Sequence, residues 1–438
     1  MKRICRSPLL SVLAVALCPV QAVAADFDAL RMQAEALEAR TIAWRHDLHQ
    51  NPELSNREFR TAKLVAAHLE SLGLETRTGI AHTGVVGVLR GGRPGPVIAL
   101  RADMDALPVT EQTGLPYAST VTTTFNGQET GVMHACGHDA HVAILMATAE
   151  LLAGMREQLS GTILFIFQPA EEGSPAGEEG GAKLMLAEGV FADPRPAAVF
   201  GLHVTSLLPS GVTSVRAGPL MAGADRFEIV VTGSQTHGAK PWQGVDPVVT
   251  AAQIVMGLQT IVSRQVDVTL APSVVSVGMV QGGIRFNIIP DDVTLVGTIR
   301  TFDEDMRADI HRRMERTATS IAEAAGATAS VEIGLGLPVT VNDPALTERM
   351  LPVLERAVGA DAVRTAELAT WAEDFSYYAR EVPGFFFFLG VTAGDKDPAT
   401  APPNHSPFFE VDDAGLSTGV VALSTLAIDY LESGEALR

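Results

Sequence analysis

Short apolar segments that alternate with helical segments are the feature that most constrains this fold. The runs at residues 162–167 and 197–202 are bounded by glycine or proline and are too short for helices, so we expect buried strands there. Between such runs, apolar residues recur at helical spacing, as at residues 138–153. Strands that alternate with helices are typical of an α/β domain with a mostly parallel sheet. Hydrophobic residues make up 47% of the chain, which is enough to supply the core of such a domain.

A second unit interrupts this pattern near Gly211. The spacing predicts strand, strand, helix, strand, strand, helix and strand at residues 212–216, 227–231, 247–262, 274–280, 293–299, 304–325 and 330–335. This order indicates a compact α+β insert. The α/β character then returns with a helix, a buried strand of four phenylalanines and a last helix, at residues 345–357, 385–389 and 413–431. We therefore predict one α/β domain in two parts, residues 25–215 and 332–438, interrupted by a second domain at residues 216–331.

The N-terminus has the three parts of a secretory signal peptide. Residues 1–6 carry three positive charges, residues 9–17 are apolar, and Ala-Val-Ala at residues 22–24 fits a cleavage site. An uncleaved anchor is the alternative. We expect residues 1–24 to be removed and the mature protein to be secreted or periplasmic. We judge no later apolar run long enough to cross a membrane, so we expect no membrane contact after cleavage.

Net charge and cysteine count exclude several classes of protein. The formal net charge of −19 disfavours nucleic acid as a partner, because phosphates are also anionic. Of three cysteines, Cys5 and Cys18 fall within the predicted signal peptide. The mature chain keeps Cys136 alone, which excludes a framework of intrachain disulfides. A lone thiol in an oxidising compartment is inert, reactive or a metal ligand.

The densest group of polar side chains surrounds that cysteine. In the stretch MHACGHDAH, Cys136 and His138 lie on either side of a glycine that lets both side chains reach one centre. A thiolate and an imidazole are good ligands for a borderline divalent metal ion. The alternative is a helix N-terminus with incidental histidines. We expect His134 and His141 to support such a site rather than to bind an ion.

Other strand ends and loops carry similar residues. Glu171 and Glu172 follow a predicted strand, where one carboxylate can bind a metal ion while the other takes a proton. Ligand-type side chains also follow other strands or lie in a proline-rich turn: Asp103, Asp105, His203 and His405. Taken singly, each has a simple alternative, such as a core histidine or a solvated acidic loop. Because all of them belong to strand ends or loops of one domain, we expect a chemical site there.

Eight stretches, in chain order, carry a resemblance to a known family: HDLHQNPELSNREFRT, ALRADMDALPVTEQTGLPYAS, GVMHACGHDAHVA, FQPAEEG, GLHV, FNIIPDDVTLVGTIRTF, EDFSYY and NHSPFF. The mature chain resembles the metal-dependent amidohydrolases that include hippurate hydrolase and plant auxin–amino-acid conjugate hydrolases. These belong to the aminoacylase/carboxypeptidase clan of dinuclear metallopeptidases. The resemblance implies a mostly parallel-sheet catalytic domain interrupted by an α+β lid and dimerisation domain.

The resemblance also implies two divalent metal ions per subunit, with manganese, zinc, cobalt or nickel all compatible with the ligands. Cys136 would bridge the ions, where other members of the clan use an aspartate. Four residues would complete the two sites: His138, Glu172, His203 and His405. Asp103 lies where the wider clan has a metal-binding histidine, whose place His138 takes. Asp105 would orient a ligand, and Glu171 would be the general base.

The insert resembles the lid of this family, which implies a homodimer or a higher homo-oligomer. His237 would stabilise the oxyanion of the reaction, in the wider clan at the partner subunit's active site. Asn287 and Arg300 would hold the substrate carboxylate, although a surface salt bridge is an alternative role for Arg300. Residues 240–247 are bulkier than the commoner version of this lid segment, and they leave its detailed contacts open.

From this resemblance we predict an enzyme that uses a metal-activated water to cleave N-acyl amino acids to a carboxylic acid and a free amino acid. Hippurate-like, auxin-conjugate-like and aromatic-acyl phenylalanine substrates, including ochratoxin-type amides, all fit. The alternatives among hydrolases are a dipeptidase, an N-acetyl-amino-acid deacetylase and a carboxypeptidase. An inactive binding protein is disfavoured, because every matched ligand and the base are present.

Overall fold

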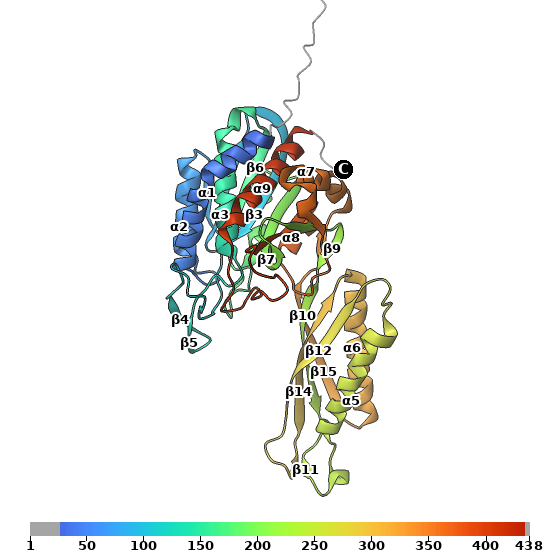
Figure 1. Cartoon of the computed structure of the whole chain (residues 1–438). Helices are drawn as coiled ribbons and strands as arrows, with labels where there is room; N and C mark the ends of the chain where they lie inside the picture. Colours follow the sequence, from blue (N-terminus) through green and yellow to red (C-terminus); the bar gives the residue numbers. More distant parts are fainter. Residues whose placement is uncertain (1–26, 434–438) are drawn as a thin grey trace, which may run out of the picture.

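A large sheet forms the framework of the molecule (Figure 1). The computed structural model describes residues 27–433, and its eight-stranded sheet has the order β1-β2-β6-β3-β7-β18-β8-β17. The central strands run parallel to one another: β6 (Ser160–Gln168), β3 (Arg93–Asp103), β7 (Ala198–Pro209) and β18 (Gly384–Thr392). The flanking strands are β1 (Glu75–Ile80), β2 (Gly84–Arg90), β8 (Thr213–Val215) and β17 (Val363–Thr365). The mostly parallel α/β sheet predicted from the sequence is confirmed.

Helices cover both faces of this sheet. The first core contains side chains of α1 (Phe27–Gln50), α2 (Phe59–Ser71), α3 (His138–Gly154), α7 (Pro344–Val358) and α9 (Leu416–Glu432). The second core contains side chains of α4 (Gly181–Ala187) and α8 (Phe375–Glu381). Because side chains alternate along a strand, Phe385 and Phe387 of β18 pack in the first core while Phe386 and Phe388 pack in the second. The buried strand predicted for this phenylalanine run is confirmed.

One helix corrects our expectation about apolar runs. Among residues 27–433, the segment Asp413–Glu432 is long and apolar enough to cross a membrane, so the prediction that no later run has this length was wrong. The segment contains α9, which packs in the first core, and 78% of its apolar window is buried. Burial inside the domain accounts for its composition. The predicted signal peptide lies outside the described residues.

A smaller sheet projects away from this domain (Figure 1). Its antiparallel strands, in sheet order, are β12 (Ser273–Gln281), β14 (Asp292–Thr301), β10 (Gly223–Thr232) and β15 (Thr328–Leu337). The helices α5 (Pro247–Thr260) and α6 (Glu304–Ala324) share its core. We call residues 223–337 the inserted domain. β9 (Gly218–Met221) and β16 (Thr340–Asn342) pair where the chain leaves and returns, and β11 (Thr236–His237) pairs with β13 (Ile288–Ile289) at the far end.

The strand predicted at residues 212–216 belongs to the large sheet and not to the insert. β8 pairs with β17 and with two residues of β18, Phe388 and Leu389. All of its residues are buried. A run of five residues does not show which sheet it joins. Counting this strand in the pattern of the insert was wrong, although the predicted domain boundary falls after residue 215. The sequence also did not reveal the hairpin of β4 (Thr122–Phe125) and β5 (Gln128–Gly131).

Candidate metal centre

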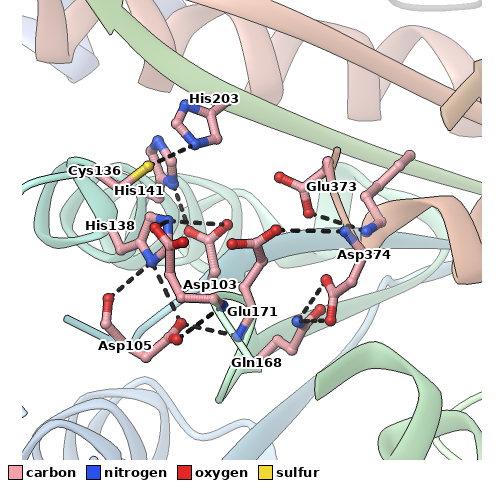
Figure 2. A network of polar contacts seen from close by, with 12 residues as sticks. Asp103, Asp105, Cys136, His138, His141, Gln168, Glu171, His203, Glu373 and Asp374 are labelled. Atoms are coloured by element: carbon pink, nitrogen blue, oxygen red, sulfur yellow. Dashed lines mark hydrogen bonds and ion pairs between the residues drawn. The ribbon is translucent and has the colours of Figure 1, made fainter. Parts of the chain in front are cut away.

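Ligand-type side chains converge at the carboxyl edge of the parallel strands (Figure 2). Asp103 is the last residue of β3, and Glu171 and Glu172 follow β6 in the next turn. His203 lies in β7, and His138 is the first residue of α3. Parallel strands bring their carboxyl ends to one edge, which explains why residues far apart in the sequence meet here.

The Cys136 sulfur lies between two imidazoles from distant parts of the chain. Its Sγ is 3.3 Å from His203 Nε2 and 3.2 Å from His405 Nε2. His203 Nδ1 is 2.7 Å from the Val204 carbonyl oxygen, which can only accept, so Nδ1 carries the proton. The Nε2 lone pair of neutral His203 therefore faces the sulfur, as metal ligation requires.

Two groups of potential ligands share this sulfur. Cys136, His138 and His203 form one group, and Cys136, Glu172 and His405 form the other. Within each group the ligand atoms lie within 4.8 Å of one another. This spacing suits the bond lengths of about 2.0–2.3 Å that thiolate and imidazole ligands make to zinc.

Buried polar atoms in the cluster lack hydrogen-bond partners among the described residues. His138 Nδ1 donates to the Asp105 carbonyl oxygen at 2.8 Å, and the buried Nε2 has no hydrogen-bond partner among the described residues. Glu172 Oε1 makes no hydrogen bond of good geometry, although it lies at ion-pair distance from His405 Nε2, 3.1 Å, and 4.0 Å from His138 Nε2. Unpaired buried acceptors are unfavourable unless a cation or water satisfies them. The donor set and its unpaired atoms therefore fit divalent metal ions.

A glycine is required between the two ligand-type residues of the cysteine loop, Cys136 and His138. Gly137 has a φ of +90°, in the region that disfavours other residues. A Cβ at this position would lie 2.3 Å from Cγ2 of Val204, well inside van der Waals contact. The close approach of this loop to β7 brings Cys136 beside His203.

The residues next to the ligand-type side chains hold the cluster in place. His141 Nδ1 donates to Asp103 at 2.5 Å, and His141 Nε2 accepts from the Val204 N–H at 2.8 Å. Because both ring nitrogens are engaged, His141 supports β7 and Asp103 instead of offering a free ligand atom. Asp105 accepts from the backbone N–H groups of Glu171 and Glu172, each at 3.0 Å. His134 is buried and neither of its ring nitrogens has a hydrogen bond within the described part of the chain.

Glu171 stands against a buried acidic network that the sequence did not reveal. Arg101 contacts Asp103 at 2.6 Å, Glu373 at 2.9 Å and Asp374 at 2.8 Å. Burial and then the neighbouring Glu373 hold the pKa of Glu171 well above its usual range. In the sequence, the stretch EDFSYY at residues 373–378 contributes to the family resemblance. Nothing in it predicts that Glu373 and Asp374 pair with Arg101.

The three predicted residues of the inserted domain lie away from this cluster in the same chain. His237 and Asn287 are neighbours at the far end, where the Gly238 N–H donates to the Asn287 carbonyl oxygen at 2.9 Å. Arg300 lies near the other end of β14, opposite Ala224 of β10. None of the three is among the described residues that line the cavity at the cluster.

A cavity of about 400 Å³ opens beside the cluster. Its floor carries the ligand-type residues Cys136, Glu171, Glu172, His203 and His405. Its walls are largely apolar and include Leu207, Met221, Leu337, Trp371 and Phe388. The rings of Trp371 and Phe388 meet edge to face with centroids 6.1 Å apart. A polar floor with apolar walls is the arrangement of a small-molecule site.

Comparison with known proteins assigns the chain to a family. The model of peptidase family M20/M25/M40 matches residues 99–429, three quarters of the sequence. The chain belongs to this family. It is 42% identical over 403 residues to thermostable carboxypeptidase 2 of Saccharolobus solfataricus, covering 92% of this chain and 98% of that protein. It is 38% identical over 392 residues to an IAA-amino acid hydrolase of Arabidopsis thaliana, covering 89% and 84%.

The fold agrees with a solved structure of this peptidase family. A dinuclear metal-binding peptidase of Bacillus subtilis superposes with a TM-score of 0.76 at 38% identity, over 91% of this chain and 99% of that one. The predicted resemblance to metal-dependent amidohydrolases is confirmed, and the chain is an amide-hydrolysing enzyme of the M20 type. The peptidase from Bacillus subtilis and the ligand groups described above both support a metal centre.

Replacement of the shared sulfur tests whether the cluster binds metal as a unit. Burial and then the nearby Glu172 carboxylate raise the pKa of the Cys136 thiol, so a bound cation is needed to ionise it. We expect Cys136→Ser to fold but to bind metal more than about 100-fold more weakly, because an alcohol is a poorer ligand than a thiolate. Elemental analysis and circular dichroism of the purified variant measure both properties. Normal metal content in a folded variant would contradict the role of the sulfur.

Proposed function

We propose that this enzyme hydrolyses N-acyl amino acids that carry an aromatic or bulky apolar group, releasing a carboxylic acid and a free amino acid. The observation that carries the proposal is the cavity, whose ligand-rich floor faces walls of Trp371, Phe388 and Met221. Hippurate-like, auxin-conjugate-like and ochratoxin-type amides share a flat apolar group beside the scissile amide, and such a group complements these walls.

The proposed metal ligands are the two groups that share Cys136. His138 and His203 would hold one ion with the sulfur, and Glu172 and His405 would hold the second. Manganese, zinc, cobalt and nickel are all compatible with thiolate, imidazole and carboxylate ligands. Bound ions would polarise the scissile carbonyl and lower the pKa of a water molecule. Asp105 fixes the tautomer of His138, since its carbonyl oxygen accepts the Nδ1 proton.

Glu171 is the proposed general base. Its carboxylate lines the cavity, and one oxygen lies 3.4 Å from the Asp374 N–H. It would take a proton from the attacking water and return that proton to the leaving amine nitrogen. The neighbouring carboxylate, Glu172, lies beside His405 and is left for metal binding.

A substitution that keeps the shape of the side chain but removes its carboxyl group tests this assignment. We expect Glu171→Gln to lower kcat by about 10²–10⁴-fold, because an amide cannot accept the proton, while metal content stays normal. Glu178→Gln is the matched control, since Glu178 lies in the same loop but forms an exposed ion pair with Arg57. If Glu171→Gln hydrolysed hippurate as fast as the control, another group would have to be the base.

Substrate preference tests the apolar wall. We expect the wild-type enzyme to prefer N-benzoylphenylalanine over N-acetylglycine, and Trp371→Ala to reduce that ratio of kcat/KM by about tenfold or more. Phe125→Ala is the control, because Phe125 is an exposed aromatic residue of β4 outside the cavity. A wild-type preference for N-acetyl substrates would favour a deacetylase instead. Cleavage of dipeptides or of longer peptides in preference to acyl amino acids would favour a dipeptidase or a carboxypeptidase.

We propose that a partner subunit completes the site in a homodimer or higher homo-oligomer. The described residues that line the cavity include no lysine or arginine to bind a substrate carboxylate. His237 would supply an oxyanion donor, and Asn287 and Arg300 would contact the substrate carboxylate from the inserted domain. His237 is exposed at the far end of that domain, so it is free to contact another subunit.

Mixing two inactive variants tests this assignment. We expect Glu171→Gln and His237→Ala to be inactive alone and to recover activity after subunit exchange, since one mixed site would then hold both groups. No recovery in confirmed mixed oligomers would place His237 in its own subunit's site or outside catalysis.

We propose that the mature enzyme is secreted or periplasmic and begins after residue 24. The support is the pattern of charge, apolar run and small residues at the N-terminus. N-terminal sequencing of the exported protein measures the cleavage position, and an intact Met1 on exported protein would contradict it.

A further inference from the structure

Two buried carboxyl groups hold the turn that carries Glu171 and Glu172: Asp105, described above, and Glu58. We propose that Glu58 is a positioning residue for this turn, acting through the Ala170 backbone. The inference rests on the proposed function, because it concerns the turn that presents the general base. Glu58 belongs to the stretch NPELSNREFRT, to which neither the proposed metal site nor the general base assigns a role.

Two carboxyl groups accept the backbone N–H groups of three consecutive residues. The Ala170 N–H donates to Glu58 Oε1 at 2.9 Å, and the next two N–H groups, of Glu171 and Glu172, donate to Asp105 at 3.0 Å each. With all three N–H groups bound to buried carboxyl groups, the backbone of this turn has a fixed orientation. The side chains of Glu171 and Glu172 are thereby presented to the cavity.

The backbone at Ala170 needs such support. Its φ is +55°, in the left-handed region that alanine rarely adopts because its Cβ is crowded there. An unusual backbone conformation persists where surrounding bonds enforce it. The hydrogen bond from its own N–H to Glu58 is such a bond, and it lies immediately before the proposed base.

Glu58 does not perform the role that its position in the helix would suggest. It occupies the N-cap position of α2, where a side chain ordinarily accepts N–H groups of the first turn, yet it makes no such bond. Glu53 does this instead, because it accepts from the N–H groups of Arg60 at 2.9 Å and Thr61 at 2.8 Å. Glu58 turns away from its own helix towards Ala170, and the helix keeps its cap.

Hydrogen bonds hold both carboxyl oxygens of Glu58 in place. It is fully buried, and its second oxygen accepts from the Thr83 hydroxyl at 2.6 Å. Burial and then the nearby Asp105 raise its pKa to about 8. A carboxyl group in so unfavourable a place needs compensation, which two well-formed hydrogen bonds supply. A glutamine would fit the same contacts, with its oxygen on Ala170 and its NH₂ donating to Thr83.

Four variants separate positioning from stability. We expect Glu58→Ala to lower kcat by about 10–100-fold with little change in KM, because the base is displaced while the cavity walls remain. We expect Glu58→Gln to retain activity within about threefold, because it keeps the acceptor at the same reach, whereas Glu58→Asp should lose activity because its carboxyl group is one methylene shorter. Glu53→Ala is the matched control, because it also removes a carboxylate with two backbone N–H partners. We expect it to lower Tm and leave kcat unchanged.

The rates are measured on folded, metal-loaded protein with a substrate that the wild type hydrolyses. If Glu58→Ala does not fold, the contrast between Glu58→Gln and Glu58→Asp carries the test. The inference is wrong if Glu58→Ala keeps kcat within twofold of wild type, if Glu53→Ala lowers kcat equally, or if Asp substitutes for Glu58 better than Gln does. A wild-type protein without activity on any acyl amino acid would instead overturn the proposed function itself.

Discussion

Repulsion among buried carboxylates is the constraint on which the rest of this site depends. Asp103, Glu373 and Asp374 share one guanidinium, that of Arg101. Two more carboxyl groups, Glu171 and Glu172, lie in the turn after β6. Negative charges gathered in a buried place are unfavourable unless cations balance them. Arg101 balances the group on one side. On the other side lie a buried thiol and imidazole nitrogens without partners, which is the environment that divalent metal ions would stabilise.

The fold brings these charges together through its topology. Four parallel strands end at one edge, where the strands, the turn after β6 and the N-terminus of α3 bring ligand-type residues together. Hydrogen bonds then fix each group: the backbone of Val204 holds His141 and His203, and Asp105 holds the turn after β6. These supports belong to strands and helices of a packed core. The rigidity of the domain therefore holds the cluster in one geometry.

The ligand-type residues could be predicted from the sequence because each lies in a distinctive sequence context. Cys136 and His138 flank a glycine, and Glu171 and His203 follow apolar runs that could only be buried strands. The network around Arg101 could not be predicted in this way. Arg101 lies inside a strand and Asp374 before a short helix, and pairing between positions 273 residues apart depends on which strands are neighbours. For the same reason, the sequence did not show that β8 pairs in the large sheet. Length and composition alone also did not separate α9, a buried core helix, from a membrane-spanning helix.

We propose that Cys136 joins two metal ions at this edge of the sheet. Crystals of the mature enzyme loaded with zinc or cobalt, measured on both sides of the metal absorption edge, test it directly. We predict two anomalous peaks about 3.5–4 Å apart, each about 2.3 Å from the Cys136 sulfur, with imidazole and carboxylate ligands completing each site. A single peak, or peaks that do not contact this sulfur, would contradict the account.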